Sequence, residues 1–245
     1  MISSVRERRF HEDFPVTALL LLFNIAFFFL ETIGTLRKLG DMSELDIMVP
    51  IDPIVTYVLG SISFDDLSRG EYWRLLSAAF LHGSAFHLLL NMVVLFDLGK
   101  FCEPFLSSWK FFTAYVASAL GSSLASAGYG WLKGNPFRTS VGASGALAGM
   151  VGLLLVHSIR QRDTDMRDGL LRWILMLVAL SFIMPNIDHA GHAGGLVTGA
   201  LFGISAPAYM TSRAAYRWRW PAYAAGAMTL VALGISAWSY FARLS

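Results

Sequence analysis

Charged residues are confined to short stretches of this chain, and long apolar segments separate them. A helix needs about 20 mostly apolar residues to cross roughly 30 Å of hydrocarbon. Segments that approach this length lie at about 15–33, 76–98, 109–128, 143–159, 170–186, 190–208 and 221–241. The pattern therefore predicts an all-α, polytopic transmembrane helix bundle of seven spans, of which the fourth and fifth are the shortest.

The composition agrees with a membrane protein. Hydrophobic residues make up 55% of the 245 residues and charged residues only 15%, with a mean hydropathy of +0.54. A soluble domain carries about 25% charged residues, so most of this chain is suited to a bilayer and not to water. The net charge of +2 gives no reason to expect a nucleic-acid partner.

The first apolar segment is expected to remain in the protein as a membrane anchor. Three arginines within residues 6–9 precede it, as in a signal peptide, but acidic residues between positions 7 and 13 dilute that basic region. The apolar stretch from Val16 to Leu30 is long, and no small-x-small cleavage site follows it. Residues 1–14 are then a cytoplasmic N-terminal segment.

The distribution of lysine and arginine predicts the orientation, because short cytoplasmic loops carry an excess of these residues. With the N-terminus inside, the second, fourth and sixth spans run from the outside to the inside, and the C-terminus lies outside. The cytoplasmic segments then hold most of the 19 basic residues, namely Arg6, Arg8, Arg9, Lys100, Lys110, Arg160, Arg162, Arg167, Arg172, Arg213, Arg217 and Arg219.

A single cysteine, Cys102, excludes an intramolecular disulfide and a metal site built on thiolates. The chain also lacks the glycine-rich loops that bind nucleotide phosphates, so we expect no cofactor and no metal. The one long connection, at 34–75, is acidic but contains apolar stretches. Loops of this length are often functional, and a membrane-surface hairpin or short helices would account for it.

Polar side chains inside the spans gather at one level. His82, His87 and Asn91 are expected in the first half of the second span, Ser144 at the start of the fourth and His192 at the start of the sixth. These three spans run in the same direction, so all five side chains lie toward the extracytoplasmic face. Polar residues at such depth are costly and are therefore candidates for function.

Ser144 is the candidate nucleophile. It lies in the sequence Gly142-Ala143-Ser144-Gly145, where a helix begins. Flanking glycines allow close backbone approach, and the free N–H groups of a helix N-terminus stabilise the oxyanion that forms when serine attacks an amide. The same residues would also suit a small packing residue or a helix cap, because glycine and serine are common in membrane helices.

His192 is the candidate base. Glycine recurs at every fourth position from 191 to 203, and small residues also follow one face at 145–152. Packing these two faces together would bring His192 against Ser144, and a neutral imidazole could then take the hydroxyl proton. The glycine pattern alone would also suit a small transporter, but a transporter predicts polar residues near the midplane and broken helices.

The remaining histidines and Asn91 have more than one interpretation. His87 and Asn91 are spaced i, i+4 on one helix face, so they could donate to an oxyanion or form a polar clamp between helices. His82, nearer the surface, is expected to hydrogen-bond structurally. His189 is expected to be a solvated neighbour of the site.

Taken together, these motifs resemble the rhomboid family of intramembrane serine proteases. The resemblance covers about residues 70–205 and rests on ordered motifs, which are His82-x4-His87-x3-Asn91, Trp73-Arg74, Glu103, Gly142-x-Ser144-Gly145 and Gly191-His192-x-Gly194-Gly195-x3-Gly199. It implies a Ser144–His192 dyad without a carboxylate, in keeping with our expectation that no acidic residue lies at that depth. It also implies an oxyanion hole of His87, Asn91 and the Ser144 amide.

The resemblance further implies a six-helix core at 15–208 with a partly embedded first loop at 34–75, which Trp73 and Arg74 would stabilise. Residues 209–245 would form a linker and an additional seventh helix. His82, Trp73, Arg74, Glu103, Gly142, Gly145, Gly195 and Gly199 would support the site. Ala148 departs from the family, because many members carry an aromatic residue there that stacks on the histidine.

The predicted function is hydrolysis of peptide bonds in single-span or other transmembrane proteins, at the extracytoplasmic side of a bacterial cytoplasmic membrane. The lipid bilayer is the other expected partner, and the sequence does not indicate an oligomeric state. The alternative is a catalytically inactive rhomboid-like protein that binds membrane clients, although such a protein has no need to keep both Ser144 and His192.

Overall fold

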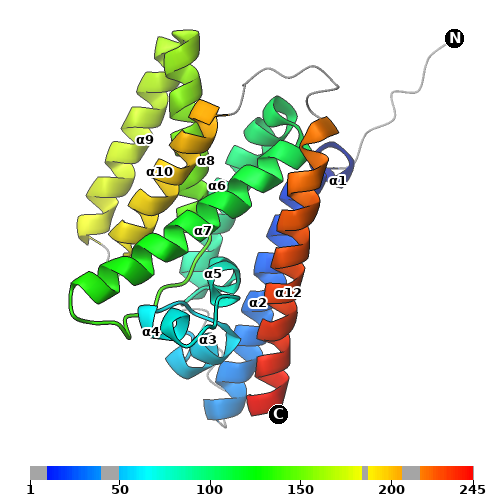
Figure 1. Cartoon of the computed structure of the whole chain (residues 1–245), viewed down its shortest axis with the longest axis vertical. Helices are drawn as coiled ribbons and strands as arrows, with labels where there is room; N and C mark the ends of the chain where they lie inside the picture. The colour runs from blue at the N-terminus through cyan, green and yellow to red at the C-terminus, as the bar shows by residue number, and fades with distance from the viewer. Residues whose placement is uncertain (1–9, 40–49, 184–186, 206–215, 245) are drawn as a thin grey trace, which may run out of the picture.

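The computed structural model describes residues 10–39, 50–183, 187–205 and 216–244, and within these ranges the fold is all-α (Figure 1). An isolated β-bridge between Ile62 and Ser140 is the one extended pairing found there. The helices are α1 (Phe10–Asp13), α2 (Pro15–Leu39), α3 (Pro53–Leu59), α4 (Phe64–Ser68), α5 (Arg74–Ser77), the 3-10 helix η1 (Ala78–Phe80), α6 (Ala85–Leu106), α7 (Ser108–Leu132), α8 (Ser144–Gln161), α9 (Thr164–Ile183), α10 (His189–Ser205) and α12 (Arg219–Leu244).

The second span begins later than the sequence predicts. We expected a helix at 76–98, but α6 begins at Ala85, and α5 and η1 precede it. The hydroxyl of Ser84 caps α6 by accepting a hydrogen bond from the His87 N–H at 3.2 Å. The prediction was wrong because residues 75–81 are as apolar as the helix itself, although they pack inside the protein and do not continue it. His82 therefore lies outside α6.

By length and apolar composition, three helices in the described ranges could cross a membrane by themselves, over Pro15–Lys38, Ala85–Leu106 and Arg219–Arg243. The other four expected spans correspond to α7, α8, α9 and α10, which are shorter or richer in small and polar residues. The expected ends at 184–186 and 206–208 lie outside the described residues. Most residues of α8 are buried. The surface of α8 therefore contacts other helices of the protein, whereas the surface of an isolated span would contact lipid.

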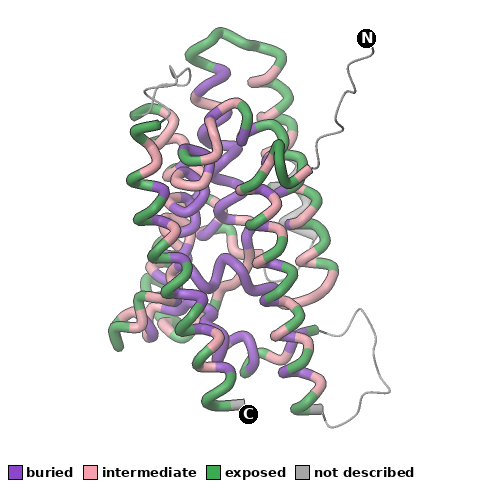
Figure 2. Tube along the Cα trace, turned by 90° about the vertical axis from the view of Figure 1, so that its right-hand side faces the viewer, coloured by how far each residue is buried: buried purple, intermediate pink, exposed green. Residues whose placement is uncertain are grey.

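Helices α8 and α10 touch through their backbones. A Cβ atom on Gly195 would lie 1.9 Å from the Gly145 carbonyl oxygen, and one on Gly199 would lie 1.8 Å from that of Gly149. No side chain fits between helices this close, so glycine is required at these contacts. Figure 2 shows buried residues gathered where the helices face one another and exposed residues along the outer faces.

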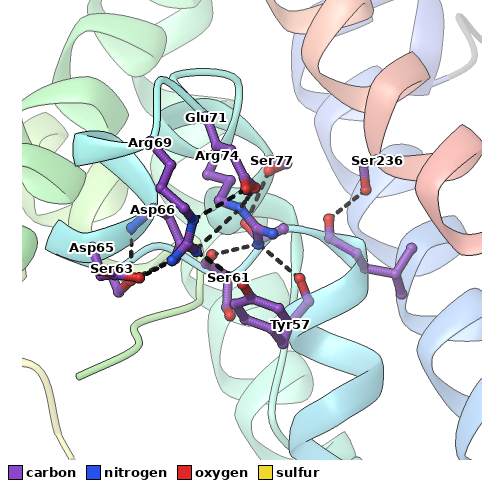
Figure 3. Close-up of polar contacts among 12 residues, drawn as sticks. Tyr57, Ser61, Ser63, Asp65, Asp66, Arg69, Glu71, Arg74, Ser77 and Ser236 are labelled. Atoms are coloured by element: carbon purple, nitrogen blue, oxygen red, sulfur yellow. Dashed lines mark hydrogen bonds and ion pairs between the residues drawn. The ribbon is translucent and has the colours of Figure 1, made fainter. Parts of the chain in front are cut away.

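The segment after α2 contains short helices, as the sequence allowed. Helices α3, α4 and α5 lie together at the end of the bundle shown at the bottom of Figure 1. The Arg74 side chain is only 1% exposed, and it donates to the Glu71 carboxylate at 2.6 Å and to the carbonyls of Tyr57 at 2.7 Å and Ser61 at 3.0 Å (Figure 3). A buried guanidinium with several acceptors makes this segment a rigid unit.

Trp73 lies against the same unit. Gly60 ends α3 with a left-handed φ of 105°, and a Cβ there would lie 2.3 Å from the Trp73 ring. The Arg74 guanidinium also lies 4.7 Å from the centre of the Trp73 ring. Only glycine accepts both this backbone conformation and this approach of the indole ring.

The C-terminal helix α12 packs against the segment that contains α3 and α5. It also packs against α7, and its Ser236 hydroxyl donates to the Leu59 carbonyl at 2.5 Å (Figure 3). Tyr240 is buried, and a Cβ on Gly34 of α2 would lie 2.9 Å from its ring. Helices α2 and α12 therefore run side by side (Figure 1).

At the other end of the bundle, Glu103 connects α6 to the first residues of α2 and α7. It lies in α6, but its carboxylate accepts hydrogen bonds from the Val16 N–H at 2.9 Å, the Thr17 N–H at 2.8 Å and the Thr17 hydroxyl at 2.7 Å. The Ser108 hydroxyl of α7 also donates to it at 2.7 Å. The free N–H groups at the start of α2 thus find a buried anionic partner on a different helix.

Candidate active site

Ser144 is the first residue of α8, at the end of a tightly held loop. Gly142 has a left-handed φ of 123°, and its N–H donates to the Ala78 carbonyl at 2.8 Å. This backbone turn places the Ser144 hydroxyl at the helix N-terminus, beside N–H groups that have no partner within the helix. Ser144 is half-buried, so its hydroxyl remains partly accessible.

His192 approaches this hydroxyl from the first turn of α10. Its Nε2 atom lies 2.7 Å from the Ser144 Oγ atom. When the neutral ring carries its proton on Nδ1, Nε2 accepts the hydrogen bond from the serine. Because α8 and α10 meet through glycine backbones near these residues, the contact depends on helices that are already in close packing.

His87 lies on the other side of Gly142. A Cβ added to Gly142 would lie 2.9 Å from the His87 Nε2 atom and 3.7 Å from the Ser144 Oγ atom. The imidazole of α6 and the serine of α8 therefore face the same small volume. The two residues belong to different helices, and the lack of a side chain at Gly142 lets them approach.

Asn91 is one turn further along α6 and is buried. Its amide nitrogen donates to the His87 carbonyl of the same helix at 3.1 Å. An amide NH₂ group has two N–H donors, so this bond leaves one of them for another acceptor. His87 and Asn91 are one turn apart on the same face of α6, and the His87 ring on this face lies beside Gly142.

His82 lies behind His87 and is fully buried. The two rings are 5.0 Å apart at an angle of 65°. The His82 backbone N–H donates to the Glu31 carboxylate of α2 at 2.9 Å, and its ring nitrogens have no hydrogen-bond partner within the described ranges. Its observed hydrogen bond therefore involves the backbone and not the ring.

Our sequence reasoning missed Glu31 and the contacts of Asp188, and the expectation that no acidic residue lies at this depth was wrong. Glu31 is fully buried in the second half of α2 and reaches the loop that precedes α6. An ionisable residue within a membrane-spanning helix is itself a signal, and it would have identified Glu31. Neither carboxylate forms a hydrogen bond with the His192 ring in the described structure.

Asp188 directly precedes α10 and accepts a hydrogen bond from the Ser140 hydroxyl at 2.6 Å. Burial favours the neutral carboxyl, but the hydrogen bonds from Ser126, Ser140 and the Gly191 N–H, together with the Arg138 charge, lower the pKa of Asp188 below its ordinary value. The residue is therefore a carboxylate at neutral pH.

A cavity of about 10 Å³ lies behind the loop that carries Ser144. Its lining includes Ser122, Ser123, Ser140 and Gly142. This volume corresponds to about one water molecule, and three hydroxyl groups can satisfy one.

Several of the residues expected as structural support lie away from Ser144 and His192, and Trp73 and Arg74 were expected to stabilise the first loop. Trp73 and Arg74 belong to the unit at α3–α5, and Glu103 lies at the opposite end of α6, beside the start of α2. Ala148 is only 8% exposed, so protein atoms already cover the position where the family often has an aromatic residue. His189 is exposed.

Comparisons with known proteins agree with the motifs. The family model of the Rhomboid domain matches residues 69–208. The chain is 33% identical over 136 residues to rhomboid protease GluP of Bacillus subtilis, covering 54% of this chain and 26% of that protein. It is 32% identical over 150 residues to RHOMBOID-like protein 5 of Arabidopsis thaliana, covering 60% of this chain and 48% of that protein. It is 27% identical over 158 residues to rhomboid protease AarA of Providencia stuartii, covering 56% of this chain and 56% of that protein. The match thus spans about half or less of each relative.

Proposed function

The chain belongs to the rhomboid family, and we propose that it is an intramembrane serine endopeptidase that cleaves transmembrane segments of other proteins. The observation that carries this proposal is the distance of 2.7 Å between the Ser144 Oγ and His192 Nε2 atoms. A hydroxyl next to an imidazole at a helix N-terminus is the arrangement that serine nucleophiles require.

The reaction begins when the Ser144 oxygen attacks the carbonyl carbon of the scissile peptide bond. His192 takes the hydroxyl proton and then gives it to the departing amine, so that an acyl-enzyme and a free amino terminus form. Water then attacks the acyl-enzyme, with His192 as base, and releases the carboxylate product. Both half-reactions use the same two side chains, and no metal or cofactor takes part.

The oxyanion of each tetrahedral intermediate needs donors already in place. We assign this role to the Ser144 N–H, the His87 ring and the Asn91 amide. The His87 ring lies beside Gly142, on the side of the serine. One N–H of the Asn91 amide donates to the His87 carbonyl, and the second N–H is available to the oxyanion.

The dyad operates without a third member. Within the described ranges, the His192 ring has the Ser144 hydroxyl as its hydrogen-bond partner. The ring is instead held by its position on the first turn of α10, where the backbone N–H of His192 donates to the backbone carbonyl of Asp188 at 3.0 Å. Backbone packing of α8 against α10 supplies the orientation that a carboxylate supplies in other serine proteases.

We place the N-terminus in the cytoplasm and the site toward the extracytoplasmic side of a bacterial cytoplasmic membrane. In a Cys102→Ser background, a cysteine at Gly134 should react with an impermeant thiol reagent added outside, and one at Asp165 should not. Both positions are exposed and lie in or beside short loops at opposite ends of the bundle. The reverse labelling pattern would contradict this orientation.

The central test is cleavage of a single-span reporter by the purified protein in vesicles. Wild type should cleave it and Ser144→Ala should not. Ser158→Ala is the matched control, because Ser158 is a buried serine of the same helix whose hydroxyl donates to the Leu155 carbonyl at 2.8 Å. Cleavage by Ser144→Ala at the wild-type rate would overturn the assignment. Binding of the reporter without cleavage by wild type would favour the client-binding alternative.

A further inference from the structure

Asp188 connects two parts of the chain that meet beside the candidate dyad. Its side chain is 16% exposed. One carboxylate oxygen accepts from the Ser140 hydroxyl at 2.6 Å, and the other accepts from the Gly191 N–H at 3.1 Å and from Arg138 at 3.3 and 3.4 Å. Both oxygens are thus occupied by donors other than the His192 ring.

The bond to Gly191 belongs to α10 itself. Asp188 directly precedes this helix, and its side chain accepts from an N–H of the first turn, as helix-capping residues do. His192 lies on that same turn, and its N–H donates to the Asp188 carbonyl at 3.0 Å. Asp188 therefore orders the turn that carries the candidate base.

The bonds to Ser140 and Arg138 belong to the loop that ends in Ser144. This loop is fixed on its other side by the segment between α3 and α4, because Ser140 and Ile62 exchange two backbone hydrogen bonds of 2.9 and 3.1 Å. Asp188 supplies the connection from this loop to α10. One side chain thus links the segment of the candidate nucleophile to the segment of the candidate base.

We propose that Asp188 is a positioning residue that fixes the separation of Ser144 and His192 by joining the start of α10 to the loop between α7 and α8, which contains Ser140. This inference rests on the proposed function. The glycine contacts hold the helix bodies together, whereas helix termini fray unless their ends are capped. A displacement of about 1 Å between reacting groups can cost about 100-fold in rate, so a bond at the helix start matters for turnover.

The test compares Asp188→Asn, Asp188→Ala and Ser140→Ala with wild type, in the full-length protein. Asparagine keeps the helix cap but removes the charge that pairs with Arg138, and alanine removes both. We expect kcat to fall about 10-fold for Asp188→Asn and about 100-fold for Asp188→Ala, with KM unchanged, because the displacement affects chemistry and not binding. Ser140→Ala should lower kcat by about as much as Asp188→Asn does. In the double variant, the loss of kcat should be smaller than the two single losses combined, since the two residues contact each other.

Asp52→Asn is the matched control. Asp52 also caps a helix, accepting from the Ile54 N–H at 2.7 Å, and also pairs with a cation, Lys38, at 2.7 Å. It lies before α3, and its carboxylate bonds to Lys38 of α2 and Ile54 of α3, so its loss should leave kcat unchanged. The melting temperature of each variant shows how much stability the two caps contribute.

Labelling with a fluorophosphonate separates this inference from the function on which it rests. Wild type should be labelled at Ser144, and the Asp188 variants should be labelled more slowly, in proportion to their loss of kcat. Wild-type protein that is neither labelled nor active would refute the proposed function itself. Asp188→Asn and Ser140→Ala proteins that are labelled and cleave at the wild-type rate, or that change KM alone, would overturn the role of Asp188 and leave the protease assignment intact.

Discussion

Gly195 of α10 lies directly against Gly145 of α8, since a Cβ on Gly195 would be 1.9 Å from the Gly145 carbonyl oxygen. Gly145 is the neighbour of Ser144, and Gly195 is within one turn of His192. A close approach of the two backbones is thus adjacent to the contact between the candidate nucleophile and base. Helix packing and the geometry of the site cannot vary independently.

Gly195→Ala should therefore lower both stability and activity. Overpacking of a close contact costs about 1–3 kcal/mol, and separation of the helices would lengthen the Ser144–His192 contact. Thermal unfolding and reporter cleavage, measured together, check this. Gly234→Ala is the control, because Gly234 is exposed on α12, an added Cβ there would meet no neighbouring side chain or helix within 4 Å, and alanine is the better helix former. Wild-type stability and rate in Gly195→Ala would contradict the backbone contact.

The dyad should behave as one unit. Ser144→Ala and His192→Ala should each abolish cleavage, and the double variant should be no slower than either single variant, because each change disables the same step. His189→Ala serves as control, since this histidine is exposed. The residual cleavage rates of the two single variants and the double variant, measured over extended incubation, are compared. If the loss of rate in the double variant equals the product of the losses in the two single variants, the two side chains act separately.

Asn91→Ala should reduce kcat with little change in KM. Removal of one oxyanion donor costs about 100- to 1,000-fold in turnover, although shared donors reduce the loss. Asn24→Ala is a matched control, because buried Asn24 makes the same type of bond to its own helix, donating to the Leu20 carbonyl at 2.7 Å. If both variants cleave at the wild-type rate, Asn91 is only a packing residue.

Glu31→Ala should destabilise the protein. It removes the acceptor of the buried His82 N–H, and an unsatisfied buried donor costs about 1–3 kcal/mol. Glu31→Gln retains a carbonyl oxygen at the same place and should recover most of the stability. Denaturant unfolding in detergent measures the difference, and an alanine variant as stable as wild type would show that the Glu31–His82 bond contributes nothing.

Glu71 should make stability depend on acid pH. Burial raises the pKa of Glu71, but the hydrogen bond and charge of Arg74, with the charges of Arg69 and Arg243, lower it below the ordinary value. The stability from this ion pair is present above the ordinary pKa of about 4.3, and it is lost as pH falls through the lower folded-state pKa. The melting temperatures of wild type and Glu71→Gln should therefore converge as the pH is lowered from 7 to 3. A constant difference would exclude Glu71 as the titrating group.

Much of this arrangement is local and could be predicted from the sequence. The lengths of the apolar segments predict the membrane class and the long helices, because crossing a bilayer imposes a length on each segment. The glycines that flank Ser144 predict a helix start. The spacing of His192 along the glycine face predicts that it points toward the neighbouring helix, because residues three and four apart share a face.

The rest depends on contacts between distant residues, which no local pattern contains. Residues 75–81 are apolar whether they form a span or a buried loop, so only their burial under α2 and α7 decided where α6 begins. Glu103 caps α2 from 86 residues away, and Asp188 binds a loop that lies 48 residues earlier. The sequence by itself determined the membrane class, the presence of the long helices and the candidate nucleophile and base. The tertiary structure decided which carboxylates support them, because a buried charge is stable only beside partners that folding brings to it.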